Sequence, residues 1–520
     1  MILHVIRKEL LVNLLSLRFQ AGFLVSVVMM GLVGYVLVEE YAARQQTYLS
    51  SVQEHQKALA NNKVYSTVEA IVDIPPSPLS AFSRGTIELP TSVRVSPYHI
   101  PSLIDEEGTG TAINLSGSSD RPTNPLLKMF ASIDLSFVIS TILSLFAVLL
   151  VFDSFSGERE QGTLKLLLSS STGRVHLLVG KYLGALITLA IPLTVGFLEV
   201  LILWIFHARL SLEPSVWAGM GVIYLVSLIF LAGFLSFALF LSLFARESSS
   251  CLMNLLLAWV TFVILIPEGG KAAADYFRPN GLRQKILTDV ENAQTDFLNA
   301  YTGMNYQQKG GWNNVSTNPF EGESFLGITE DEARNRMEFN RKIVPQKFQF
   351  AENRYRIVES YGEALTSWAT IRDNITRPSL CVQFTNAVEA IAGTDLQTFG
   401  QTVGRARIYR DAVMSFLQQK VDSPEWFTRV FEYPDVQPTD ENMRYWQKLI
   451  DTKGERSVER ILSWDRIAPV NLSGLPPPRI EVTGLPERFG HALFDIMLLL
   501  VTTSAFLVLS IVRIVRYAVQ

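Results

Sequence analysis

The chain has 520 residues, of which 48 % are hydrophobic, and its mean hydropathy is +0.23. With 45 Lys and Arg against 49 Asp and Glu, the net charge is −4, which argues against nucleic acid as a partner. A hydrophobic share this high, beside long polar stretches, predicts very apolar segments mixed with ordinary ones. The composition therefore favours a membrane protein with sizeable parts outside the bilayer.

A short basic segment, residues 1–18, precedes the first apolar run. Its apolar residues, such as Ile6 and Leu10, recur near helical spacing, while Arg7 and Lys8 lie off that stripe. This pattern predicts an amphipathic helix lying in the membrane interface. The alternative is a simple extension of the span that follows.

Six apolar stretches are long enough to cross a bilayer, since about 20 residues at 1.5 Å each span a core of about 30 Å. Each is predicted to be helical, because a lone segment in lipid satisfies its backbone hydrogen bonds only internally. The predicted spans cover residues 19–38, 132–152, 177–206, 215–244, 250–267 and 489–512. Pro192 is expected to kink the third span and Pro267 to end the fifth. The predicted fold class is an all-α polytopic membrane protein.

Basic residues fall on the same side of all these spans. They precede the first span, lie between the second and third and between the fourth and fifth, and follow the sixth: Arg7, Lys8, Arg18, Arg159, Lys165, Arg174, Lys181, Arg246, Arg513 and Arg516. The positive-inside rule makes that side the cytoplasm, with both termini inside. The first span is longer than a signal-peptide core, so we expect an uncleaved membrane anchor.

Two large segments, residues 39–131 and 268–487, are then predicted to lie outside the membrane. In the first, the Pro-rich run at 74–78 and a Gly/Ser/Thr-rich patch at 108–120 indicate loops, and residues 85–98 show an alternation that favours strands. The second is predicted to be mostly helical, because Glu, Arg, Lys, Gln and Ala dominate three of its stretches. These stretches cover residues 330–367, 385–420 and 441–463.

The second outer segment carries no motif of metal-ligand spacing, and none of the 6 histidines of the chain falls within 268–487. No pairing of a nucleophile with a general base emerges either. The hypothesis that the chain is a membrane-anchored enzyme is therefore weak. Cys251 and Cys381 are predicted to lie on opposite sides of the membrane and to form no disulfide.

The predicted cytoplasmic segment 153–176 combines charges with leucines. Glu158, Arg159 and Glu160 lead through Gly-Thr into Leu164 and three further leucines. A short helix of this kind can lie along the membrane while its polar flank contacts a soluble partner, and charged pairs then set recognition and register. The alternative is a charged face that is merely solvated.

This segment resembles the coupling element of the ABC-2 permease family. Glu-Arg-Glu-X-Gly-Thr-Leu is followed by leucines, a Ser-rich turn, an Arg and a later Gly-Lys, while the proline usual near residues 171–172 is absent. The resemblance implies contact with an ATP-binding subunit through Asp153, Gly157, Glu158, Arg159, Glu160, Gly162, Thr163, Leu164, Arg174 and Lys181. Charge reversal at both Glu158 and Glu160 would then uncouple ATP hydrolysis from transport.

Residues 377–380, 387–395, Phe399 and 409–410 resemble the extracytoplasmic domain of a bacterial permease subfamily grouped with gliding-motility transporters. Together the resemblances imply an exporter permease for a lipid-like or other substrate. Its partners would be a second permease protomer, identical or related, and a periplasmic protein. The alternative is a non-transporting mechanotransmission or scaffold component that drives periplasmic proteins.

The chain itself shows no phosphate-binding loop. Between Gly173 and Gly180-Lys181 lie six residues where that loop has four, and Tyr182 stands where a Ser or Thr would hold magnesium. We therefore expect the chain to bind no cofactor, and ATP and Mg²⁺ to bind the separate ATP-binding subunit.

Four ionisable residues lie in or near the apolar runs: Asp134, Glu199, His491 and Asp495. A charge at the centre of a span costs about 2.5–3.5 kcal/mol on the insertion scale, so each is a candidate functional residue. Three of them are predicted near the outer surface. Glu199 is the deepest and is expected to pair with a neighbouring helix.

Overall fold

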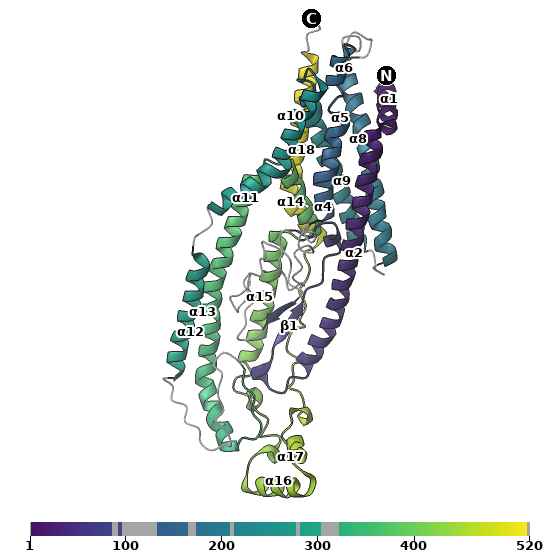
Figure 1. Ribbon diagram of the computed structural model, residues 1–520. Helices are drawn as coiled ribbons and strands as arrows, with labels where there is room; N and C mark the ends of the chain where they lie inside the picture. Colours follow the sequence, from purple (N-terminus) through teal and green to yellow (C-terminus); the bar gives the residue numbers. More distant parts are fainter. Residues whose placement is uncertain are drawn as a thin grey trace.

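The computed structural model describes residues 2–85, 92–95, 133–164, 173–207, 213–276, 281–302 and 322–516. These residues form an elongated, mostly helical molecule (Figure 1). Both chain ends lie at one end of the molecule, and α16 (Asp440–Lys453) and α17 (Arg456–Ile461) lie at the other. We call the end with the chain termini proximal and the opposite end distal.

Six helical segments of the described residues are long and apolar enough to cross a membrane, and they share one proximal bundle. Their bounds are Leu17–Ala60, Leu135–Glu160, Arg174–Phe206, Pro214–Ser242, Ser248–Ala274 and Leu485–Val515. The predicted class, an all-α polytopic membrane protein, is confirmed.

Four of these spans are single helices: α2 (Leu17–Ala60), α8 (Arg174–His207), α9 (Pro214–Ser242) and α18 (Leu485–Val515). The second span is built from α4 (Leu135–Phe137), the π-helical η3 (Val138–Leu143), α5 (Ser144–Val151) and α6 (Ser156–Glu160). The fifth is built from α10 (Ser248–Val260), the π-helical η4 (Thr261–Leu265) and α11 (Ile266–Tyr276).

The fifth span runs through the proline that was expected to end it. Pro267 is the second residue of α11, directly after the π-helical turn of η4, and the helix continues to Tyr276. A proline near the start of a helical piece needs no N–H, and the wider π turn shifts the hydrogen-bond register around it. The helix end predicted at Pro267 is therefore wrong. Pro192, by comparison, lies inside the uninterrupted α8.

Glycines bring α2 and α8 close together. A Cβ on Gly34 would lie 2.6 Å from Cγ2 of Val200, and a Cβ on Gly196 would lie 2.3 Å from Sδ of Met30. In lipid no hydrophobic force drives helices together, so close backbone approach supplies the packing contacts instead. A side chain at either glycine would push these two helices apart.

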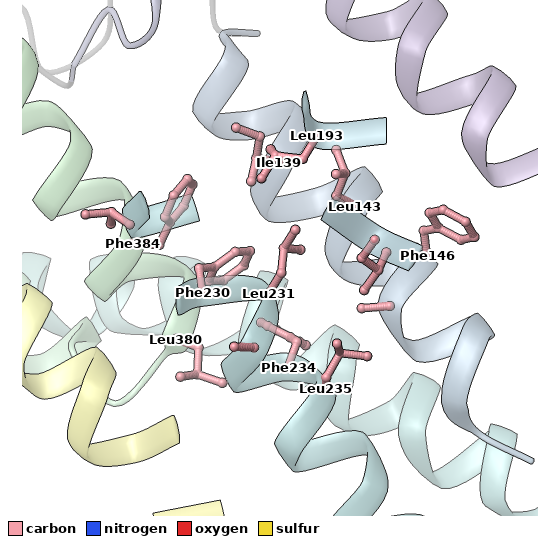
Figure 2. Packing of buried hydrophobic residues seen from close by; sticks show 14 of the residues in the cluster. Ile139, Leu143, Phe146, Leu193, Phe230, Leu231, Phe234, Leu235, Leu380 and Phe384 are labelled. Carbon is pink, nitrogen blue, oxygen red and sulfur yellow. The ribbon is translucent and has the colours of Figure 1, made fainter. Parts of the chain in front are cut away.

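The core of the bundle is centred on α9 (Figure 2). Phe230 and Phe234 are fully buried, and Figure 2 shows them between side chains of η3 and α5 and side chains of α14 (Leu380–Ala392). The ring of Phe230 stacks on that of Phe384 with centroids 4.6 Å apart. A helix from a segment predicted to lie outside the membrane thus packs within the bundle core, against α9 and α18.

Two very long helices connect the bundle to a distal body. α2 has 44 residues and α13 (Glu330–Thr376) has 47. At 1.5 Å per residue each is about 65–70 Å long, roughly twice the thickness of a bilayer core. α12 (Leu282–Thr302) packs beside α13, and α15 (Leu396–Gln418) runs through the distal body.

The distal body has a core of its own, which includes Tyr65, Val413 and Trp426. Its sheet pairs β1 (Ala70–Asp73) antiparallel with β2 (Ser92–Val95). β2 falls within the stretch 85–98 that favoured strands, whereas the patch at 108–120 lies outside the described residues. The described residues also form five short 3₁₀ helices, at Tyr65–Thr67, Pro78–Ala81, Pro424–Trp426, Pro434–Val436 and Trp464–Arg466.

Candidate functional site

The segment between the second and third spans lies at the proximal end of the bundle (Figure 1). α6 is a single helical turn, and Gly162 follows it with φ +74°, a left-handed conformation that glycine adopts without strain. Leu164 is buried, while residues 165–172, including the later leucines, lie outside the described residues. The predicted amphipathic leucine turn is therefore described only at its start.

Arg159 holds the turn that follows α9. Its guanidinium donates to the carbonyl oxygens of Leu243 at 3.1 Å, Phe244 at 3.5 Å and Ala245 at 2.5 Å. Carbonyls at the end of a helix have no intrahelical donor, and a cation there also complements the helix dipole. Arg159 thus joins the charged segment to the end of the fourth span.

Glu160 binds the start of the fifth span. One oxygen of its carboxylate accepts the backbone N–H of Ser248, the first residue of α10, at 3.1 Å. The N-cap residue Glu247 makes no side-chain capping bond, so Glu160 supplies the acceptor from another element.

Two further charged residues of the segment contact other spans, one through a hydrogen bond and one through an ion pair. Arg174, at the start of α8, donates to the carbonyl of Val515 at the end of α18 at 2.9 Å. Asp153 pairs with Arg18, near the start of α2, at 2.6 Å. Charged residues of one segment therefore contact the proximal ends of four spans, α2, α9, α10 and α18.

The helix α1 (Ile2–Leu15) packs against α8 at Gly180, Lys181 and Gly184. A Cβ on Gly180 would lie 2.7 Å from Cγ1 of Val5, and a Cβ on Gly184 would lie 2.9 Å from Cβ of Glu9. Between them the buried Lys181 places its Nζ 2.9 Å from a carboxylate oxygen of Glu9. The Gly-Lys pair noted in the sequence therefore packs the N-terminal helix closely onto the third span.

Glu158 contacts both the segment and α8, whereas Gly157 and Thr163 make contacts within the segment. Glu158 lies 3.8 Å from Nζ of Lys181, and the hydroxyl of Thr163 donates to its carboxylate and, at 3.1 Å, to its carbonyl. The N–H of Gly157 donates to the carbonyl of Asp153 at 2.9 Å. All ten predicted coupling residues therefore gather at the proximal end, and most of their polar groups bind within the chain.

Sequence reasoning missed Ser242, which orders the turn before α6. Its buried hydroxyl accepts the backbone N–H groups of Phe155 at 3.2 Å and Ser156 at 3.3 Å and donates to the carbonyl of Phe152 at 3.0 Å. Ser242 is one of four serines in α9, so its position at the end of the span was the one available signal.

Glu160, Gln161 and Gly162 are three consecutive exposed residues in the described part of the segment, and we call them the tip. The tip sits directly on the contacts that Arg159 and Glu160 make with the fourth and fifth spans. A soluble protein that pressed on this tip would therefore act on several helix ends at once.

Arg159→Ala is expected to loosen the turn after α9. Three bonds from a charged donor are lost, and one such bond contributes about 1.5–3 kcal/mol. Hydrogen exchange of the amides in residues 243–247 should accelerate by at least about tenfold, the factor for about 1.4 kcal/mol. Arg246→Ala, at an exposed neighbouring position, is the control, and equal exchange in both variants would contradict the role of Arg159.

The polar candidates Asp134 and Asp495 bind groups at the distal end of the bundle. Asp134 is the N-cap of α4, accepts the N–H of Phe137 at 2.7 Å, and also accepts the hydroxyl of Ser83 at 3.1 Å. Asp495 of α18 is buried and pairs with Arg377 at 3.0 Å, directly after the end of α13. Asp495 therefore joins the last span to the long distal helix.

His491 and Glu199 occupy different surroundings. Nδ1 of His491 lies 3.5 Å from Asp395, and its Nε2 lies 3.2 Å from the amide nitrogen of Gln401. The carboxylate of Glu199 lies against Gly31 of α2, and its Oε2 has no hydrogen-bond partner among the described residues. The expected partner on a neighbouring helix is not found in that part of the chain.

No group of three or more His, Cys, Asp or Glu side chains in the described part of the chain is arranged to hold a metal ion. Cys251 and Cys381 are both buried and free. The candidate site is therefore a set of contacts between helix ends and an exposed tip.

These features define a multi-pass membrane protein whose charged proximal segment joins the ends of its spans. The sequence model of the family described as "ABC-2 family transporter protein" matches residues 3–308, which include the whole of that segment. The match covers more than half of the chain, and the chain belongs to this family.

Two curated proteins illustrate the similarity. The probable ABC transporter permease protein NosY of Pseudomonas aeruginosa is 38% identical over 133 residues, which make up 24% of this chain and 45% of that protein. The protein of the same name from Stutzerimonas stutzeri is 34% identical over 125 residues, again 24% and 45%. The chain thus spans less than half the length of each curated relative.

Proposed function

We propose that the chain is the permease subunit of an ABC-2-type exporter in a bacterial inner membrane, with the proximal end in the cytoplasm. A separate ATP-binding subunit holds ATP and Mg²⁺, and this chain supplies no catalytic group. A second permease protomer, identical or related, completes the path along which a lipid-like or other substrate moves outward. The observation that carries the proposal is the exposed tip at Glu160–Gly162, in a segment whose charged residues contact four helix ends.

The contacts of the tip suggest how ATP binding does mechanical work. Closure of the ATP-binding subunits displaces the tip, and Arg159 and Glu160 pass that displacement to the ends of α9 and α10. Arg174 passes it to α18. Because these helices pack around one core, a shift of their proximal ends alters their packing along the bundle.

The test of this proposal is Gln161→Lys. Gln161 is exposed at the tip and, unlike Glu158 and Glu160, contributes no described side-chain bond to the helix ends. In nanodiscs that contain the chain with its ATP-binding subunit, a misplaced charge at the contact should weaken the complex about tenfold, or by about 1.4 kcal/mol. Transport-linked ATP turnover should fall with it.

Gln418→Lys provides the matched control, because Gln418 is equally exposed but lies on α15 of the distal body. If Gln161→Lys leaves both the affinity for the ATP-binding subunit and the ATP turnover unchanged, the proposal is wrong. Reversal of Glu158 and Glu160 is a poorer test, since it also breaks the bonds to Lys181 and Ser248.

A second candidate function is mechanotransmission to periplasmic proteins, without transport. The contact between Arg377 and Asp495 favours it, because this pair joins α18 to α13, a 47-residue helix that extends far from the bundle. The resemblance of residues 377–410 to the gliding-motility subfamily agrees with this use. Lipid or solute movement by the reconstituted complex supports export, whereas ATP turnover that responds only to a periplasmic partner supports mechanotransmission.

A further inference from the structure

A cavity of about 400 Å³ opens at the distal end of the bundle, where α2, α8, α9 and α18 meet the Pro-rich loop 75–78. This volume lies within the range of ordinary ligand pockets, about 300–1,000 Å³. Its walls include the rings of Tyr41 and Trp204, which stack with centroids 5.0 Å apart. Aromatic residues of this kind gather where a membrane meets water, at the level of lipid headgroups.

Arg488 places a buried positive charge in the cavity wall. Only 6% of the residue is exposed, and its Nη1 donates to the hydroxyl of Ser77 at 3.0 Å and to the carbonyl of Ala392 at 3.3 Å. Both acceptors are neutral, and Nε has no hydrogen-bond partner among the described residues. Buried charges in proteins are normally paired, yet no carboxylate of the described residues lies within ion-pair distance of this guanidinium, and the charge of Asp395 acts on it only from farther away.

Trp204 supplies a second N–H in the wall that has no described acceptor, besides the Nε–H of Arg488. Trp204 is 1% exposed, and its indole N–H, a group that only donates, has no acceptor in the described part of the chain. Trp204 of α8 and Arg488 of α18, each with one N–H that has no acceptor among the described residues, thus line the same cavity.

Two helix N-termini add to this positive field. α9 begins at Pro214 and α18 at Leu485, neither N-cap makes a side-chain hydrogen bond, and both helix starts line the cavity. The helix dipole makes such termini favourable for anions, although Pro214 and Pro486 have no N–H and the amides of Val216 and Trp217 already donate to the carbonyl of Glu213. Two carboxylates oppose this field: Glu213, the N-cap of α9, and Glu487, in the first turn of α18. Both residues are exposed, so water and salt screen their charges.

We propose that this cavity binds a phosphate group, held by Arg488, the indole N–H of Trp204 and the starts of α9 and α18. The phosphate is that of an anionic lipid headgroup in the adjoining leaflet or free inorganic phosphate. A planar guanidinium suits the paired oxygens of a phosphate, and the stacked rings and prolines form an apolar rim. This site goes beyond the proposed function and does not depend on the ATP-binding subunit.

The test uses the full chain in nanodiscs that contain phosphatidylcholine with spin-labelled phosphatidylglycerol or spin-labelled phosphatidylcholine. The immobilised fraction of each label gives the preference of the protein for the anionic lipid. Arg488→Gln should abolish the part of that preference that arises at the cavity. Trp204→Phe, which keeps the stacking on Tyr41, should lower it about threefold, the effect of losing one hydrogen bond.

Trp217→Phe is the matched control, because Trp217 lies on α9, is 45% exposed and does not line the cavity. The same nanodiscs are then titrated with inorganic phosphate. Loss of immobilised phosphatidylglycerol on addition of phosphate identifies a site open to the free ion, and no loss identifies a headgroup site. An anionic preference equal in the wild type, Arg488→Gln and Trp204→Phe, with no binding of phosphate, overturns the proposal. Since Trp204→Phe removes one N–H only, the test stands even if Arg488→Gln fails to fold.

Discussion

Lys181→Met is expected to lower the free energy of unfolding of the purified chain by about 3–5 kcal/mol, the usual cost of removing one partner from a buried ion pair. Lys181 is 6% exposed, with Nζ 2.9 Å from Glu9 and 3.8 Å from Glu158. Without it both carboxylates lose their cation at the junction of α1 and α8. Thermal unfolding in detergent, followed by circular dichroism, measures the effect.

The double variant Glu9→Gln/Lys181→Met should be less destabilised than the sum of its single variants, because it leaves no unpaired charge on Glu9. Lys271→Met is the matched control. Lys271 pairs with Glu268 at a similar distance, 2.7 Å, but both side chains are more than half exposed, so the expected cost is about 0–1 kcal/mol. Equal stability of Lys181→Met and Lys271→Met would contradict the structural role of Lys181.

Arg377→Leu is expected to have an effect of similar size at the distal end of the bundle. Its guanidinium binds the carboxylate of Asp495, which is 4% exposed, and lies 4.8 Å from the ring centroid of Phe494. The variant leaves a buried carboxylate unpaired, at a cost of about 3–5 kcal/mol. Amides in the distal half of α18 should then exchange at least about a hundredfold faster, since each 1.4 kcal/mol corresponds to a factor of ten.

Arg341→Leu controls for the loss of any arginine from an ion pair. Arg341 binds Asp422 at 2.7 Å, with exposed side chains of 56% and 73%, and its loss should cost about 0–1 kcal/mol. If exchange in α18 is the same in Arg377→Leu and Arg341→Leu, the pair with Asp495 does not hold the last span to the distal body.

These two ion pairs bear on the proposed function in different ways. Lys181 lies beside the charged segment at the proximal end, whereas Arg377 joins α18 to the base of α13 at the distal end. If the chain is an exporter, Lys181→Met should impair ATP-coupled transport most. If it transmits force, Arg377→Leu should disconnect ATP turnover from any periplasmic partner while leaving the proximal contacts intact.

The sequence by itself determined the membrane spans and the position of the charged segment. Span length and apolarity are local properties, because a helix in lipid must satisfy its own backbone hydrogen bonds whatever its neighbours are. The motif around Glu158–Gly162 was equally visible, since its charged, glycine and leucine residues are adjacent in the chain. The end of the fifth span was predicted wrongly, because a π-helical turn carries the helix past Pro267.

Only the tertiary structure decided which residues of the segment bind other helices and which are exposed. Three charged residues bind groups far away in the chain: Arg159 binds at residue 245, Glu160 at 248 and Arg174 at 515. No local sequence pattern predicts contacts between residues so far apart. Tertiary structure also placed α14 in the bundle core, since its 13 residues are too few to signal a span by length. The length of an apolar segment can be read directly from the sequence. The partner of a buried charge depends on which helices meet, and tertiary packing determines which helices meet.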